Sequence, residues 1–387
     1  MTGGKAFEWK VALILFGVLF LGVSDTQLVP PLLSSIANEF QTSAGHTGII
    51  VTSYSLAAAV FALFAGPLSD RIGRKKVLVG GLALFTVASF STQHVTTLGA
   101  LVAARTLTGF AAGTLSTCAL SFAGDHYSYQ QRGRAMGVLS MAYFLAFVVS
   151  APAGALLAPV WGWHSIFGSL AVVGAGVFIL AIWKLPGSKA QPATTPPMLP
   201  NFHAHFVKPE RLAGITAAFL TSGGLVGFLT YLGAWLIDEQ QVGTGSMALV
   251  FMISGIAAVA AAPLSGWLAD HAGKRRVIIW SNLLLAPLFL VVARLDWGWF
   301  LWAGIALLGV AASARQAPLH ALTTEIVGAE IRGEYTAIRN AASQTGIAVA
   351  AAISSYVFDA SGFAGVSIVA AAFTALIPLS CIWLRER

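Results

Sequence analysis

Asp25 is the residue whose position most strongly implies chemistry, because it is the one carboxylate well inside an apolar run of this sequence. A charged side chain at the centre of a bilayer costs about 2.5–3.5 kcal/mol on insertion scales. Such a group needs a charged partner, an aqueous cavity or a bound proton. The sequence therefore predicts a buried ionic or proton-binding site at Asp25.

Arg105 is the candidate partner of Asp25. Asp25 lies about 16 residues from one end of its apolar run, and Arg105 lies about 8 residues from the opposite end of another; at about 1.5 Å per helical residue the two depths roughly coincide. We expect an ion pair in which Asp25 carries a coupling proton. Arg105 would keep the carboxylate charged until substrate or a conformational change separates the two groups. The alternative is a static pair that holds two helices together.

Other polar and aromatic side chains inside apolar runs are candidates for a substrate cavity. The arginines among them could bind an anionic group of a substrate through paired hydrogen bonds, or could extend to the membrane interface, as long basic side chains do. The tyrosines could form pocket walls or interface anchors. The candidate cavity residues are Gln27, Tyr54, Tyr231, Arg315, Arg339, Asn340 and Gln344.

The elements that must position these residues are membrane-spanning helices. Of the 387 residues, 57% are hydrophobic and 10% are charged, whereas soluble domains are close to one quarter charged. Twelve apolar runs of about 20 residues are each long enough to cross a hydrocarbon core roughly 30 Å thick. We therefore expect an all-α membrane protein with twelve transmembrane helices, at 9–36, 47–67, 75–92, 97–123, 135–159, 164–184, 211–236, 245–266, 275–294, 299–323, 334–357 and 363–384.

The charges between the spans predict the topology and the domains. Lys and Arg cluster in alternate connectors, whereas the opposite connectors carry acids and a single basic residue, Arg294. By the positive-inside rule, both termini are cytoplasmic. The proline-rich stretch 185–210 is typical of a linker, so we expect an N-terminal six-helix bundle at 1–184 and a C-terminal six-helix bundle at 211–387. Basic clusters confined to connectors do not indicate a nucleic-acid partner.

The two predicted halves repeat in sequence. The segments 66–76 and 266–276 share glycine, aspartate and adjacent basic residues at the same spacing, and the same offset of 200 residues relates Asp125 to Glu325. This pattern resembles the loop between the second and third spans of the major facilitator superfamily, and the chain is most like its twelve-span drug:proton antiporters. The resemblance covers essentially the whole chain. It implies two parallel, pseudo-symmetric halves with a substrate cavity between them.

The resemblance also implies a cytoplasmic latch. In the family, the aspartate at the position of Asp70 caps the N-terminus of the eleventh span, where free backbone N–H groups favour an anion. The arginine at the position of Arg74 pairs with an acid at the position of Asp125, and the latch is made when the transporter opens outward. The alternative is surface pairs worth roughly 0–1 kcal/mol each. The expected latch residues are Gly66, Asp70, Arg71, Gly73, Arg74, Asp125, Asp270, Lys274 and Glu325.

The resemblance to the same family gives a second reason to assign Arg105 to proton coupling. Together with Gly109 and Gly113 it resembles the fourth-span pattern that the family associates with proton coupling, with Thr108 in place of the usual glutamine. The resemblance thus links Arg105 to proton coupling, and in this fold the first and fourth spans both line the cavity.

The function predicted from these features is secondary transport. The sequence contains no phosphate-binding loop, nucleophile elbow, dinucleotide fingerprint or metal-ligand spacing, so we expect neither an ATP-driven pump nor an enzyme, and no cofactor or metal. We expect a proton-coupled antiporter that exports amphipathic or hydrophobic small molecules by alternating access. An organic-anion or metabolite carrier and a lipid or lysolipid transporter of the same fold are the alternatives. The expected partners are a small-molecule substrate, protons and membrane lipid, for a monomer in the bacterial inner (plasma) membrane.

Overall fold

The structure is a computed structural model that describes residues 7–187, 202–328 and 331–384. Within these ranges every regular element is a helix. In order along the chain, the elements are α1 (Trp9–Glu39), α2 (Ala44–Thr47), α3 (Ile49–Ile72), α4 (Arg74–Thr92), α5 (Leu98–His126), α6 (Tyr129–Lys184), α7 (Phe202–Phe206), α8 (Pro209–Ala234), η1 (Trp235–Glu239), α9 (Thr244–Ala272), α10 (Lys274–Val292), α11 (Trp299–Glu325) and α12 (Arg332–Ser380).

Ten helices in the described residues are long and apolar enough to cross a membrane. Helices satisfy their own backbone N–H and C=O groups, which a lipid environment requires because it offers no water. The two longest, α6 and α12, each contain one glycine with a non-helical backbone, Gly162 at φ 76° and Gly362 at φ 65°. Each of these helices therefore holds two successive spans, and the predicted twelve-helix membrane fold is confirmed.

The sequence repeat extends to the backbone turns. Gly162 and Gly362 occupy equivalent positions 200 residues apart, and so do Gln41 and Gln241, which adopt φ angles of 52° and 53°. The acids before these glutamines, Glu39 and Glu239, also act at equivalent places. The indole Nε1 of Trp163 donates to Glu39 at 2.6 Å, and the backbone N–H of Phe363 donates to Glu239 at 3.0 Å. In each half, an acid near the end of the first span thus holds the chain just after the glycine kink.

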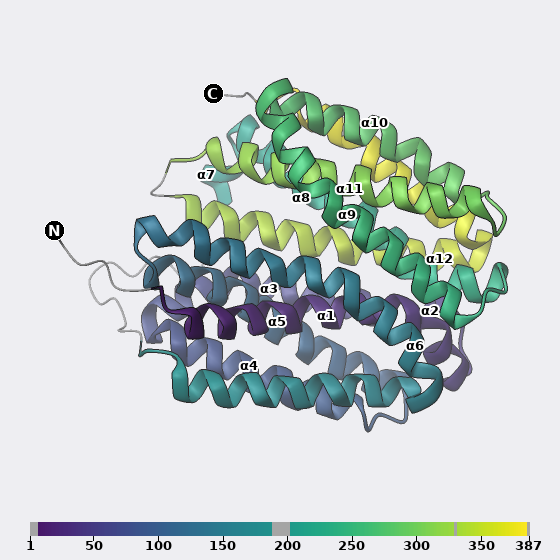
Figure 1. Ribbon diagram of the computed structural model, residues 1–387, viewed down its shortest axis with the longest axis horizontal. Coiled ribbons are helices and arrows are strands. Elements are labelled where there is room, and N and C mark those ends of the chain that lie inside the picture. Colours follow the sequence, from purple (N-terminus) through teal and green to yellow (C-terminus); the bar gives the residue numbers. More distant parts are fainter. Residues whose placement is uncertain (1–6, 188–201, 329–330, 385–387) are drawn as a thin grey trace.

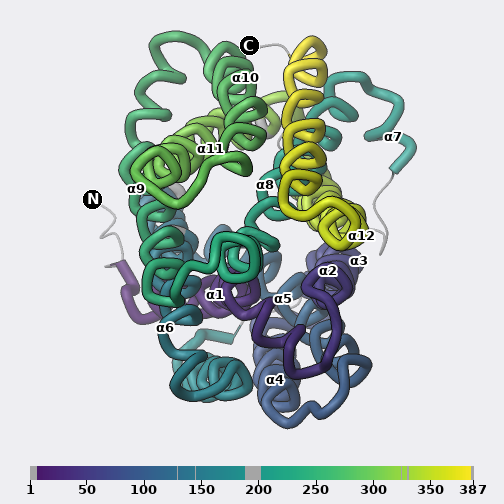
Figure 2. The backbone as a smooth tube through the Cα atoms, turned by 90° about the vertical axis from the view of Figure 1, so that its right-hand side faces the viewer, coloured from purple at the N-terminus to yellow at the C-terminus, as the bar shows by residue number. Residues whose placement is uncertain are grey.

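The long helices run side by side, with α7 near one end and α2 near the other (Figure 1). Seen from the end, α1, α4, α5 and α6 gather in the lower part of the molecule, and α8 to α11 gather in the upper part (Figure 2). Helices of the two halves are in contact, chiefly α3 with α12, α6 with α9 and α1 with α8, and the short α2 also contacts α12 and α8. The exact domain bounds stay a prediction, and most of the predicted linker lies outside the described residues.

Candidate functional site

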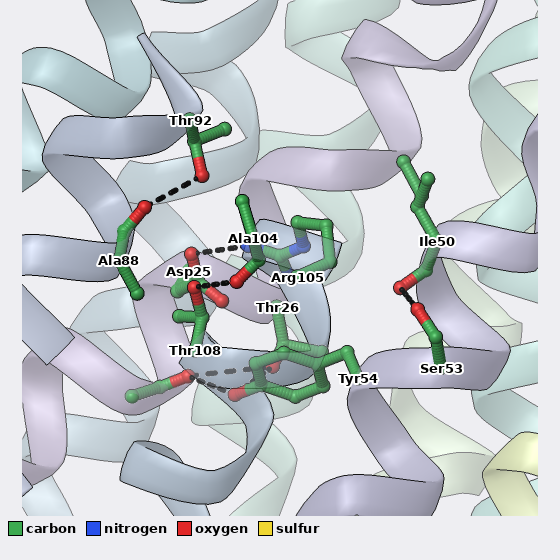
Figure 3. Close-up of polar contacts among 11 residues, drawn as sticks. Asp25, Thr26, Ile50, Ser53, Tyr54, Ala88, Thr92, Ala104, Arg105 and Thr108 are labelled. Carbon is green, nitrogen blue, oxygen red and sulfur yellow. Dashed lines mark hydrogen bonds and ion pairs between the residues drawn. The ribbon is translucent and has the colours of Figure 1, made fainter. Parts of the chain in front are cut away.

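Asp25 of α1 and Arg105 of α5 form a buried ion pair (Figure 3). Arg105 Nη1 donates to Asp25 Oδ1 at 2.6 Å, and the two side chains are 1% and 0% exposed. The structure therefore brings together the two residues that the depth comparison paired. A charge in the membrane interior is tolerated when it faces an opposite charge inside the bundle.

Aromatic rings surround the guanidinium of Arg105. Its Cζ atom lies 4.7 Å from the ring centroid of Tyr54 and 5.3 Å from that of Phe167, within the range of cation–π attraction. The Tyr54 hydroxyl accepts a hydrogen bond from Thr26 Oγ1 at 3.3 Å, beside the ion pair in Figure 3. Arg105 would thus keep favourable neighbours even if Asp25 lost its charge.

The pair leaves polar atoms without partners. Within the described residues, neither Asp25 Oδ2 nor Arg105 Nε has a hydrogen-bond partner. A buried polar atom left unpaired costs about 1–3 kcal/mol. Asp25 Oδ2 is therefore a free acceptor, although the burial of the pair separates it from solvent in this arrangement.

Glycines on α5 set the distance between Arg105 and Tyr54. A Cβ atom added at Gly109 would meet the backbone carbonyl of Tyr54, and one at Gly113 would meet that of Ala58 at 2.5 Å. Small residues at such spacing allow transmembrane helices to approach closely. The close contact of α5 with α3 places the guanidinium of Arg105 over the ring of Tyr54.

Arg315 of α11 is buried in the other half and has no acidic partner in the part of the chain that the structure describes. Arg315 Nη1 donates to Asn282 Oδ1 at 2.7 Å, and Nη2 donates to the carbonyl oxygen of Thr221 at 3.2 Å. The side chain is wholly buried, so the interpretation that it extends to the membrane interface is wrong. Asn282 was not among the predicted site residues, although an amide side chain inside an apolar run could have indicated it.

Arg339 of α12 lies in a similar setting. Arg339 Nη1 donates to Thr323 Oγ1 at 2.8 Å, and Nη2 lies 2.6 Å from His320 Nδ1. The side chain is buried, so it too stays inside the bundle. Among the described residues, neither Arg339 nor Arg315 forms an ion pair with a carboxylate.

The other cavity candidates separate into two groups. Within the described part of the chain, the side-chain amides of Gln27, Asn340 and Gln344 have no hydrogen-bond partner. Gln27 lies on α1, and Asn340 and Gln344 lie on α12. Tyr231 behaves differently, because its hydroxyl contacts the carbonyl oxygens of Gly45 at 3.4 Å and Ala351 at 3.3 Å. Tyr231 is wholly buried, so it is not an interface anchor in this arrangement, and its place in the cavity stays a prediction.

The predicted latch residues form pairs within each half. Arg74 contacts Asp125 and also Asp70, the latter at 2.9 Å, and Lys274 contacts Glu325. In the described part of the chain, Asp70 contacts Arg74 of its own half, and its capping of the eleventh span stays a prediction. The paired charges are therefore present within each half.

Comparisons with known proteins agree with this architecture. The family model described as Major Facilitator Superfamily matches residues 15–271 and 215–387. Multidrug resistance protein D of Escherichia coli (strain K12) is 27% identical over 297 residues, covering 74% of this chain and 73% of that protein. A probable sugar efflux transporter of Helicobacter pylori (strain P12) is 26% identical over 375 residues, covering 94% and 91%. The crystal structure of a D-xylose-proton symporter superposes with a TM-score of 0.81 at 16% identity, covering 98% of both chains.

Proposed function

Because the chain belongs to the major facilitator superfamily, it is a multi-pass inner-membrane secondary transporter, and we propose that it is a proton-coupled antiporter that exports amphipathic or hydrophobic small molecules. Asp25 carries the coupling proton, and Arg105 is its counter-ion. The observation that carries this proposal is the buried ion pair, in which one carboxylate oxygen is bound and the other has no partner.

The chemistry of the pair supports exchange of a proton. A neighbouring guanidinium favours the charged form of a carboxyl group, and removing that neighbour inside a low-dielectric bundle favours the protonated form. If α1 and α5 separate slightly, Asp25 takes up a proton and Arg105 stays against the rings of Tyr54 and Phe167. Protonation and helix movement are thereby linked, and each favours the other.

Export and substrate class are supported by the names of relatives. One relative is called a multidrug resistance protein and another a probable sugar efflux transporter. The unpartnered amides fit a cavity between two halves, since Gln27 lies on α1 and Asn340 and Gln344 lie on α12. A few polar groups in a largely apolar surface suit an amphipathic molecule. In this proposal, the bundles at 1–184 and 211–387 rock about that cavity, with both termini cytoplasmic.

The test is substitution of Asp25 by Asn in proteoliposomes, with a fluorescent amphipathic cation such as ethidium as the probe. We expect accumulation driven by a pH gradient to fall at least about tenfold, whereas exchange without a gradient continues. The matched control is Asp296→Asn, which removes an exposed carboxylate. Wild-type accumulation by the Asp25→Asn protein under the same gradient would refute the proposal.

A second candidate, an organic-anion carrier, is favoured by one observation. Arg315 and Arg339 are buried and lack a carboxylate partner in the described residues. Guanidinium groups bind carboxylates strongly where water is excluded. A counterflow comparison of aromatic monocarboxylates with amphipathic amines separates the candidates, because preferential exchange of the acids would favour the carrier.

A further inference from the structure

The C-terminal half holds a short turn of the N-terminal half by a carboxylate. Asp359 of α12 accepts hydrogen bonds from Ser43 Oγ at 2.7 Å and from the backbone N–H of Gly45 at 3.1 Å. Ser43 is the N-cap of α2, and its hydroxyl oxygen also accepts from the N–H of His46 at 2.9 Å. Asp359 thus accepts hydrogen bonds from both the side chain and the backbone of this short turn.

Further hydrogen bonds join the halves at the same end of the molecule. The carbonyl oxygen of Gly45 accepts from Ser355 Oγ at 2.7 Å and from the hydroxyl of Tyr231 at 3.4 Å. Ser34 of α1 donates to Asp238 Oδ2 at 3.0 Å. We name this set of contacts the outer junction, because it lies at the end predicted to face away from the cytoplasm. Its members are Ser34, Ser43, Gly45, Tyr231, Asp238, Ser355 and Asp359.

Glycines allow the two halves to approach this closely. A Cβ atom at Gly45 would collide with the carboxylate of Asp359, and one at Gly48 would collide with the hydroxyl of Tyr231. One at Gly233 of α8 would collide with the carbonyl of Pro30 on α1. Three separate positions therefore lack a side chain where the halves touch.

We propose that the outer junction is a latch that keeps the outer side of the transporter closed, and that Asp359 is its central residue. The inference goes beyond the proposed function and depends on neither the substrate nor the proton site. Among the described residues, the carboxylates of Asp238 and Asp359 accept from hydroxyl or backbone amide donors and form no ion pair. When the halves part, water can replace these donors without separating opposite charges, so the latch holds the closed arrangement and still opens readily.

The test measures distances between spin labels in the purified protein without substrate. One pair, Thr96→Cys with Trp299→Cys, lies at the outer end of the two halves, and a second pair, Gly133→Cys with Gly333→Cys, lies at the opposite end. The native cysteines are buried and can remain. Substitution of Asp359 by Asn should raise the ratio of outer-open to outer-closed molecules about tenfold, as expected when a charged acceptor is lost. The inner pair should move closer in the same sample.

Two further variants keep the test decisive. Ser43→Ala removes one donor, and Gly45→Val inserts a side chain against Asp359, so both should shift the distances in the same direction even if Asp359→Asn folds poorly. Asp296→Asn, on an exposed outer loop, is the matched control and should leave the distances unchanged. Distances in Ser43→Ala and Gly45→Val that coincide with the wild type would overturn the proposal, as would an equal shift in Asp296→Asn.

Discussion

The energetic coupling of Asp25 and Arg105 can be predicted from their burial. Both side chains are at most 1% exposed and their charged atoms lie 2.6 Å apart. Removing one partner leaves an unpaired buried charge, which costs about 3–5 kcal/mol. We therefore expect Arg105→Leu alone to destabilise the protein by about that amount. The double variant Asp25→Asn with Arg105→Leu should recover most of the loss, because no charge remains buried.

The measurement is a double-mutant cycle of the free energy of unfolding, obtained by titrating the purified protein with SDS in mixed micelles. The coupling energy should be about 2–4 kcal/mol. Lys274 and Glu325 provide the comparison, because their side chains are 27% and 41% exposed. A cycle on that pair should give no more than about 1 kcal/mol.

A coupling energy below about 1 kcal/mol for Asp25 and Arg105 would refute the reasoning. It would mean that water reaches the pair or that Asp25 is uncharged in the resting protein. Either result would remove the basis for assigning the coupling proton to this carboxylate. A large coupling energy combined with wild-type transport by Asp25→Asn would instead support the static interpretation of the pair.

Two further predictions concern helix packing and the cytoplasmic latch. Gly109→Val should destabilise the protein by about 2 kcal/mol or more, because the new side chain meets the carbonyl of Tyr54. The control Gly99→Val, with open space around it, should cost less than about 1 kcal/mol of stability. Equal melting temperatures for the two variants would contradict this account. Arg74→Ala should slow transport several-fold while changing stability by less than about 1 kcal/mol, because its partner Asp125 is 53% exposed. Lys76→Ala is the neighbouring control for transport assays, and unchanged rates in Arg74→Ala would argue against a latch at this loop.

Much of the fold follows from local properties of the sequence. Hydrophobic length identifies the spans because the bilayer thickness is fixed. Depth along two spans was sufficient to pair Asp25 with Arg105, since helical rise is constant. Gly162 and Gly362, where the two longest helices depart from helical geometry, lie in the gaps between neighbouring predicted spans.

Contacts between the halves could not be predicted in the same way. Ser43 and Asp359 are 316 residues apart in the chain, and nothing local indicates that a serine hydroxyl will meet that carboxylate. The partners of Arg315 depend on how α8, α10 and α11 pack, which span order alone does not specify. The equivalent roles of Glu39 and Glu239 could have been predicted, because the 200-residue offset that relates the loops also relates these two acids.

Helix α3 connects the two ends of the molecule mechanically. It contains 24 residues and is therefore roughly 36 Å long, with the outer junction before its first turn and the Asp70 loop at its last. Its backbone packs against α5 at Gly109 and Gly113 without intervening side chains, so the two helices should tilt together as one rigid unit. A tilt of about 10° around the middle of α3 would displace its two ends by roughly 3 Å in opposite directions.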